Sequence, residues 1–227
     1  MLLLDRRPVL AGVLFALLAY KPHFGLVLPV ALLAGRRWIA IASATATLAL
    51  MTLASLLAFG TGTWLAFRAS LPFTRTVVLE AGNTGWEKIQ SAFAAARALG
   101  AGVGTAYAIQ GALTGLVVLA LAWIWHGEAD RRLKAAALII AALLSTPYVL
   151  DYDMVVLGPA LAFAVSYALD HGFRPWEKSL LAFVFVVPIL TRAIAAATLV
   201  PLGLIAMVAF FALVISVARG RAPPPAH

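Results

Sequence analysis

Two carboxylates and two tyrosines lie close together in residues 146–153, between two apolar runs that carry no charge. The carboxylates are Asp151 and Asp153, and the tyrosines are Tyr148 and Tyr152. A carboxylate drawn toward hydrocarbon costs about 2.5 to 3.5 kcal/mol on insertion scales. The acidic pair is therefore a candidate site for binding sugar hydroxyls or for general-base work. The alternative is a solvated turn between two membrane helices, in which the aspartates act as helix caps.

Four basic side chains are candidates for the same face of the protein: Lys21, His23, Arg68 and Arg75. Cations beside an apolar groove suit a phosphate whose lipid tail stays in the bilayer, because the charge is neutralised where water is scarce. Lys21 can instead be a snorkelling anchor, and His23 a polar residue at a helix N-terminus. The acidic pair also matches the metal-binding Asp-x-Asp pattern of soluble sugar-nucleotide transferases. That pattern works in an α/β domain, so we expect neither a metal site nor a cofactor here.

The composition is that of a polytopic membrane protein. Hydrophobic residues make up 63% of the chain and charged residues 11%, and the mean hydropathy is +0.99. So few polar residues cannot cover a soluble domain. The net charge of +8 lies in short clusters between apolar runs, which indicates membrane topology rather than nucleic-acid binding. The chain has no cysteine, which excludes disulfides and thiol chemistry.

The first apolar stretch, residues 8–35, predicts a hairpin rather than one straight span. An arginine pair lies on each side of it, and the positive-inside rule places both pairs in the cytoplasm. The sequence Lys-Pro-His-Phe-Gly that begins at Lys21 supplies a turn in the middle. We therefore expect two short helices, about 8–20 and 24–35, with Lys21 and His23 at the outer tip, where the hairpin lines a cavity.

Six further apolar segments predict an all-α transmembrane bundle of about eight segments, some of them short and paired as hairpins. They are expected at about 38–59, 103–125, 135–150, 154–169, 179–191 and 197–218. Arg192 is expected at the outer turn between the last two segments. The chain should form a single transmembrane domain over residues 1–218, followed by a disordered cytoplasmic tail over 219–227.

The one long hydrophilic segment, residues 60–100, is expected to form an outer loop. Within it, apolar residues that alternate with arginines over 64–75 predict an interfacial helix. A capping box formed by Thr84 and Glu87 predicts a second helix over 85–98. The loop could act as a lid over the acidic pair.

The two aspartates are expected to have different roles. Because residues two apart, as in Asp-x-Asp, point in nearly opposite directions on a helix, only one carboxylate can face a cavity. Asp153 is nearer the following helix and is expected to cap its N-terminus. Asp151, which is close to Tyr148, is expected to face the cavity.

Three motifs resemble those of glycosyltransferase family 87, a family of integral-membrane enzymes in the GT-C superfamily. The first spans residues 10–38 and contains Lys-Pro-His-x-Gly, and the second spans residues 85–100 and contains Gly-Trp and Gln-Ser-Ala-Phe. The third, Ser-Thr-Pro-Tyr-x-x-Asp-Tyr-Asp, begins at Ser145. In this order and spacing they cover most of residues 8–165.

The resemblance implies inverting transfer of a hexose, usually mannose, from a polyprenyl-phosphate carrier to a lipid or glycan acceptor. The reaction is expected on the non-cytoplasmic face of a bacterial inner (plasma) membrane. The four basic side chains would then bind the lipid phosphate, and the aspartates and tyrosines of residues 148–153 would lie near the sugar or the acceptor. Inversion requires a base for the acceptor hydroxyl.

In this superfamily the base typically lies in a first outer loop that this chain does not contain. The chain is therefore expected to be the C-terminal portion of such an enzyme, or else an inactive relative. The rival hypotheses are a lipid or small-solute transporter built on the same broken helices, and a non-catalytic membrane subunit. The uncharged runs leave no polar path to the cytoplasm, which argues against a transporter.

Overall fold

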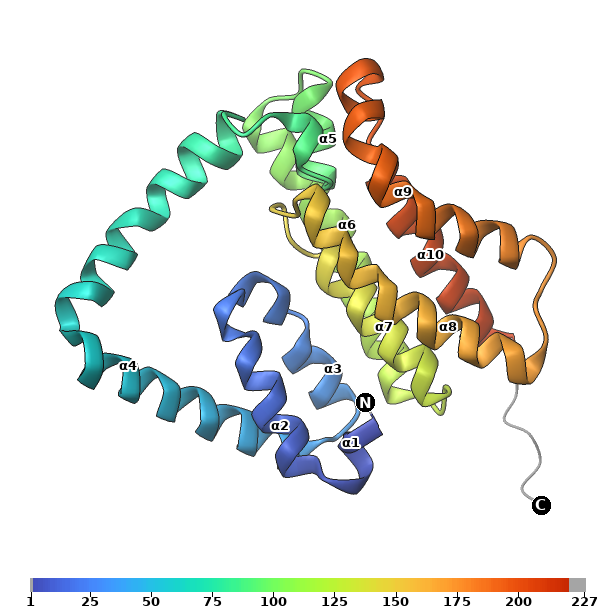
Figure 1. Ribbon diagram of the computed structural model, residues 1–227, viewed down its shortest axis with the longest axis horizontal. Helices are drawn as coiled ribbons and strands as arrows, with labels where there is room; N and C mark the ends of the chain where they lie inside the picture. Colours follow the sequence, from blue (N-terminus) through green and yellow to red (C-terminus); the bar gives the residue numbers. More distant parts are fainter. Residues whose placement is uncertain (1, 221–227) are drawn as a thin grey trace.

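The computed structural model describes residues 2–220, which fold into helices joined by short connections and contain no β-strand (Figure 1). The α-helices are α1 (Leu2–Arg6), α2 (Pro8–Ala16), α3 (Leu28–Ala34), α4 (Trp38–Phe73), α5 (Ala92–Ala98), α6 (Val103–His126), α7 (Arg131–Leu144), α8 (Leu157–His171), α9 (Glu177–Thr198) and α10 (Leu202–Arg219). Five helical segments within the described residues are long and apolar enough to cross a membrane. The prediction of an all-α integral membrane protein is confirmed.

Helices α2 and α3 form the predicted hairpin (Figure 1). Two 3-10 turns, η1 (Leu17–Tyr20) and η2 (Pro22–Gly25), lie between the two helices and reverse the chain at Lys21. Proline suits this position because it lacks an N–H group and fixes the backbone at the start of a helical turn.

Helix α2 packs closely against the first half of α4. A Cβ atom on Gly12 would lie 2.5 Å from the Ala40 carbonyl oxygen, so only glycine allows the two backbones to approach this far. The Ser43 hydroxyl donates to the Val9 carbonyl at 2.8 Å. Small residues and a hydroxyl at the contact are the usual means of joining helices within a membrane.

Helix α4 is longer than the sequence predicted. The expected span over 38–59 and the expected interfacial helix over 64–75 form one helical element, bent at Gly60, where φ is 74°. It continues into a π-helical segment, η3 (Thr74–Glu80). The first part of α4 leads away from the hairpin, and the part beyond the bend returns toward α5 (Figure 1). Large apolar side chains are exposed on both sides of the bend, such as Leu57 and Leu65. An apolar exposed face is compatible with surrounding lipid.

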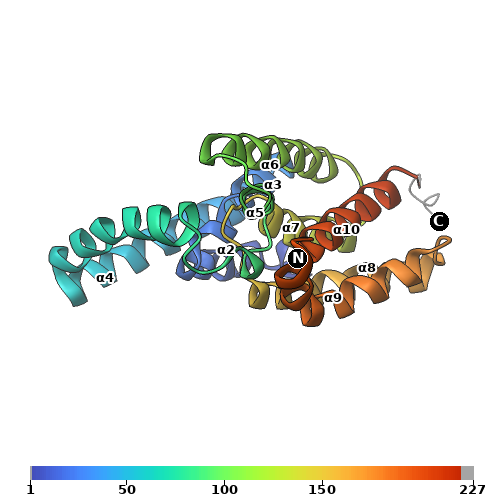
Figure 2. The same ribbon diagram turned by 90° about the horizontal axis from the view of Figure 1, so that it is seen from above.

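The main core is centred on α7, which packs against α6, α8 and α10. Its buried face contains the small residues Ala136, Ala137 and Ala141 together with Ile140. Small side chains let the neighbouring helices approach closely, as is common in membrane bundles. Helix α10 then pairs with α9 on the outer side of the bundle (Figure 2).

The outer loop differs from its prediction. Thr84 does not cap a helix, because the residue at the N-terminus of the next helical turn is Gly85. The expected helix over 85–98 is replaced by a short 3-10 turn, η4 (Trp86–Lys88), followed by α5. Ser91 caps α5 by accepting a hydrogen bond from the Ala94 N–H at 3.1 Å. The chain cannot be helical between the two elements because Ile89 and Gln90 are extended and pair with residues 149–150.

The last turn also lies further along the chain than predicted. Arg192 is not at the turn but within α9, which continues to Thr198. The chain reverses at Leu199, whose φ is 61°, and Pro201 precedes α10. A single arginine does not end a helix because its long side chain can extend to a polar partner. Most of the predicted cytoplasmic tail, residues 221–227, lies outside the described residues.

Candidate functional site

The tip of the hairpin contacts the start of η5 (Asp151–Val156), the 3-10 segment that precedes α8. Lys21 Nζ lies 2.5 Å from Asp153 Oδ1, and the side chains are 29% and 4% exposed, respectively. The ammonium also lies 5.0 Å from the centre of the Tyr152 ring and 5.5 Å from that of Phe24. The hydrogen bond to Asp153 raises the pKa of Lys21. Lys21 is thus a cation held in place at the hairpin tip, with part of its side chain accessible.

Asp153 has two contacts at once. Its second oxygen, Oδ2, accepts the Leu150 N–H at 3.1 Å, so the residue caps the start of η5 from within that segment. The sequence predicted a cap on the helix that follows Asp153, but α8 has no side-chain cap. Asp151 instead accepts the Tyr152 N–H at 2.9 Å and lies 4.0 Å from Arg192 Nε. The structure therefore differs from the expected division of roles, because the capping aspartate is also the one that contacts Lys21.

His23 and Tyr148 complete this group, which we call the tip cluster (Lys21, His23, Tyr148, Tyr152 and Asp153). The rings of His23 and Tyr148 pack edge to face with their centres 6.1 Å apart. His23 Nε2 is buried and has no hydrogen-bond partner among the described residues. A buried polar atom without a partner is costly, and such atoms are frequent where a ligand supplies the missing bond.

Arg68 and Arg75 lie elsewhere. Arg75 Nε pairs with Glu80 Oε1 at 2.7 Å, and the same oxygen accepts the Tyr107 hydroxyl at 3.1 Å. Arg68 belongs to the part of α4 beyond the bend, which lies apart from the hairpin and runs toward α5 (Figure 1). Of the four predicted cations, the structure brings only Lys21 and His23 into the tip cluster.

Gln90 fixes the outer loop beside the tip cluster, a role that the sequence analysis missed. Its N–H donates to the Val149 carbonyl at 2.7 Å, and its side-chain oxygen accepts the Thr191 hydroxyl at 2.7 Å. Thr191 also accepts the Gly203 N–H at 2.8 Å, which brings in the start of α10. The side chains of Gln90 and Thr191 are fully buried.

Gln110 holds the other side of the loop. Its oxygen accepts the Phe93 N–H at 3.2 Å, and its nitrogen donates to the Leu144 carbonyl at 2.9 Å. Hydrogen bonds in a dry interior have no water to replace them, so they fix the geometry strongly. A single glutamine within an otherwise apolar helix is a signal that sequence inspection could have used.

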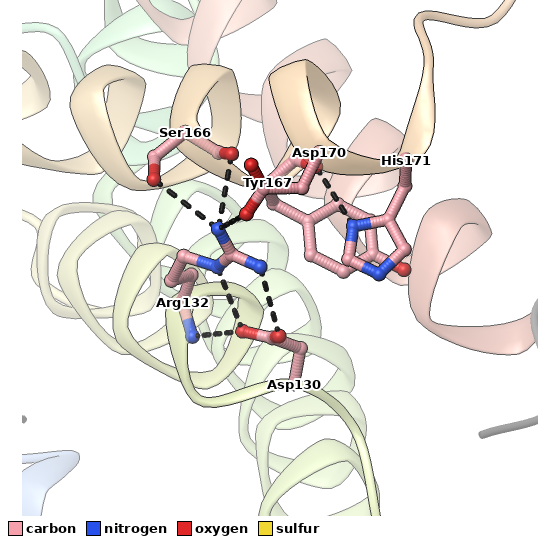
Figure 3. A network of polar contacts seen from close by, with 6 residues as sticks. All are labelled: Asp130, Arg132, Ser166, Tyr167, Asp170 and His171. Carbon is pink, nitrogen blue, oxygen red and sulfur yellow. Dashed lines mark hydrogen bonds and ion pairs between the residues drawn. The ribbon is translucent and has the colours of Figure 1, made fainter. Parts of the chain in front are cut away.

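The most extensive polar network lies at the opposite end of the bundle, between the start of α7 and the end of α8 (Figure 3). Arg132 bonds to Asp130, to Asp170 and to the backbone and hydroxyl of Ser166. Burial alone would raise the pKa of Asp130, but the hydrogen bonds from Arg132 hold it below its usual range. Because the donors of Arg132 are engaged within the protein, this network joins two helices and is not a substrate site.

No three His, Asp or Glu side chains within the described residues come together as metal ligands. The side chains of the tip cluster offer charge, hydrogen bonds and aromatic contact. It combines a cation, an unpartnered imidazole nitrogen and aromatic rings beside an apolar hairpin, a combination that suits an anionic group attached to a lipid.

Comparison with known proteins gives one finding. The family model described as Glycosyltransferase family 87 matches residues 1–150. The match includes the hairpin, the outer loop and α7, while Asp151, Tyr152 and Asp153 follow directly after it. No curated protein and no solved structure matches the chain.

Proposed function

Because the chain belongs to glycosyltransferase family 87 and is a membrane glycosyltransferase, we propose that its tip cluster binds the phosphate of a polyprenyl-phosphate-linked sugar. The sugar is a hexose, with mannose as the first candidate, and the acceptor is a lipid or a glycan. The observation that carries this proposal is the Lys21–Asp153 ion pair at the tip of an apolar hairpin.

Lys21 has the capacity to bind a phosphate while keeping its present partner. An ammonium has three N–H donors, and Asp153 accepts only one of them. His23 Nε2 adds a second group for the same anion when its tautomer carries the proton there. Leu26 and Tyr20 are exposed beside the tip and offer apolar surface to the first units of the lipid tail.

The sugar would lie toward Asp151. Its Oδ1 atom accepts the Tyr152 N–H, but its Oδ2 atom has only a distant ionic partner, 4.0 Å away, so Oδ2 can accept a hydrogen bond from a sugar hydroxyl. Tyr152 is exposed and offers an aromatic face beside the same space. Tyr148, which packs on His23, would fix the imidazole rather than contact the sugar directly.

The proposed reaction is an inverting displacement at the anomeric carbon. The bond from this carbon to the phosphate oxygen breaks, and a bond to the acceptor oxygen forms on the opposite face. The departing phosphate takes the bonding electrons, and Lys21 stabilises the negative charge that develops there. Both oxygens of Asp153 are engaged, by Lys21 and by Leu150, so a different carboxylate must accept the proton of the acceptor.

The positive-inside rule supports placing the tip cluster on the non-cytoplasmic face of the membrane. Asp5 joins Arg37 and Arg131 at 2.6 Å and 2.9 Å, at the opposite end of the hairpin from Lys21. The first turns of α7 and α9 add Lys134 and Lys178 to this basic end. In a bacterial inner membrane, the basic end would then lie in the cytoplasm and the tip cluster would lie on the outer face.

The donor class can be tested in sealed vesicles that contain the full chain. They are supplied with isotopically labelled mannose, linked either to polyprenyl phosphate or to a nucleoside diphosphate. The proposal expects label in a lipid or glycan product from the polyprenyl-linked donor only. Transfer from the nucleotide-linked donor alone would overturn the assignment of the tip cluster to a lipid phosphate.

A further inference from the structure

A cavity of about 420 Å³ opens at the basic end of the bundle, at the end remote from the tip cluster. It lies where the end of α3, the end of α6 and the start of α7 meet. Its lining residues are Ala34, Gly35, Arg36, Trp125, His126, Gly127 and Lys134. Three of these side chains carry or can carry positive charge, and none is acidic.

Within the described residues, the cations of this cavity form no ion pair with a carboxylate. The side chain of Arg36 has no hydrogen bond or ion pair with any other residue in the described part of the chain. Lys134 donates only to backbone carbonyls, those of Gly127 at 2.7 Å and Trp125 at 3.3 Å. Asp5 and Glu128 are the carboxylates whose charge acts on Lys134, and Asp5 is already shared between two other arginines. The cavity therefore has a surplus of positive charge.

Arg36 lies directly after the last turn of α3, where the chain ends the helix. The Arg36 N–H donates to the Leu33 carbonyl at 3.0 Å, and the Arg37 N–H donates to the Leu32 carbonyl at 2.9 Å. The φ of Arg36 is 54°, in the left-handed region that favours glycine. Gly35 directly precedes it but has an ordinary φ of −81°. Glycine is the usual residue at this position of a helix end, and here the position carries an arginine. The arginine side chain lines the cavity.

We propose that this cavity is a second ligand site, which binds a phosphate group such as that of an anionic lipid headgroup. The planar guanidinium of Arg36 suits two phosphate oxygens at once, and Lys134 adds a point charge. His126 provides a further donor. Trp125 forms a fixed wall because its indole N–H donates to the Lys134 carbonyl at 3.1 Å. Basic pockets between membrane helices bind anionic headgroups in this manner.

The absence of cysteine in the chain gives a direct experiment. Gly127→Cys places a single thiol in the cavity wall, where its Cβ would approach no atom closer than 3.4 Å. The rate of its reaction with an uncharged maleimide is measured in phosphatidylcholine vesicles, in vesicles that also contain phosphatidylglycerol, and in phosphatidylcholine vesicles with added glycerol phosphate. An uncharged reagent is needed because the surface charge of the vesicle would otherwise change its local concentration.

Phosphatidylglycerol is expected to slow the reaction, and Arg36→Gln is expected to abolish this protection. Arg36→Lys should keep part of it. Lys178→Gln is the matched control, because Lys178 lies at the same basic end but does not line the cavity. Protection by glycerol phosphate as well would identify the phosphate alone as the ligand, whereas protection by phosphatidylglycerol alone would identify the lipid.

Native mass spectrometry of the chain without the thiol provides an independent measurement. Arg36→Gln is expected to weaken phosphatidylglycerol binding roughly tenfold, the effect of losing a charge-assisted hydrogen bond. The proposal is overturned if neither phosphate compound protects the thiol. It is also overturned if Arg36→Gln and Lys178→Gln behave alike in both measurements.

Discussion

Lys21 and Asp153 form an ion pair of 2.5 Å although they are 132 residues apart in the chain. The contact joins the tip of the α2–α3 hairpin to the segment that begins α8. Asp153 is almost fully buried and also accepts a backbone N–H from Leu150. One carboxylate thus orients the cation of the tip cluster and fixes the backbone beside it.

Asp153→Asn is expected to impair transfer much more than Asp151→Asn. The asparagine oxygen can still accept the Leu150 N–H, but Lys21 loses its ionic partner, and turnover should fall by about tenfold or more. Asp151→Asn keeps a hydrogen-bonding side chain and removes only a long pair of 4.0 Å with the exposed Arg192, a kind of contact that contributes about 0 to 1 kcal/mol. Turnover and thermal unfolding of both variants check this ranking, which the reverse order would contradict.

Gly203→Ala should destabilise the support of the outer loop. A Cβ there would lie 2.7 Å from both Gln90 Oε1 and Met154 Sδ, in a region that is fully packed. Such overpacking typically costs about 1 to 3 kcal/mol. Gly158→Ala is the control, because a Cβ at this helical glycine meets no atom within 4 Å. Thermal unfolding in detergent should show a loss for Gly203→Ala only, and equal unfolding temperatures would refute the packing argument.

The hairpin predicts which positions an impermeant thiol reagent can reach in intact cells. Tyr20, at the tip, is 77% exposed, so a cysteine there should react from outside. A cysteine at Arg36, at the basic end, should react only after the membrane is opened. Because the native chain has no thiol, the signal is unambiguous. Equal labelling of both positions in intact cells would rule out the proposed topology.

The sequence predicts the hairpin well because its signals are local. An arginine pair on each side and a proline beside Lys21 are sufficient to divide residues 8–35 into two short helices. The short length of this stretch excludes two full spans. These constraints do not depend on any partner that is distant in the sequence.

The outer loop could not be predicted in the same way because distant contacts decide its structure. Thr84 and Glu87 form a valid capping pattern, but the pairing of Gln90 with Val149 keeps the chain extended there. The pairing of Lys21 with Asp153 rather than Asp151 is likewise a tertiary result. Helix periodicity predicts that only one of the two aspartates can face the cation, but it cannot decide which one.

The Asp5 bridge predicts a specific response of stability to pH. The hydrogen bond from Arg131, together with Arg37, holds the pKa of Asp5 below its usual range despite partial burial. A lowered folded-state pKa means that the bridge contributes fully above the unfolded pKa of about 3.9 and is lost as the pH falls through the folded value.

Asp5→Asn should therefore be less stable than the parent at neutral pH, and the difference should disappear in strong acid. The unfolding temperatures of both proteins, measured in detergent from about pH 7 to about pH 3, check this expectation. A difference that grows as the pH falls would show that the charge of Asp5 is not what stabilises the basic end.

The central claim is that Lys21 binds the phosphate of the lipid-linked donor. The most direct measurement is the KM for a polyprenyl-phosphate-linked mannose, compared among the parent, Lys21→Arg and Lys21→Ala in vesicles, with Lys178→Ala as the control. Lys21→Ala should raise the KM about tenfold or more, and Lys21→Arg should raise it much less, because a positive charge is the minimum that the phosphate requires. If Lys21→Ala has the KM and turnover of the parent, Lys21 is only a membrane anchor and the account is wrong.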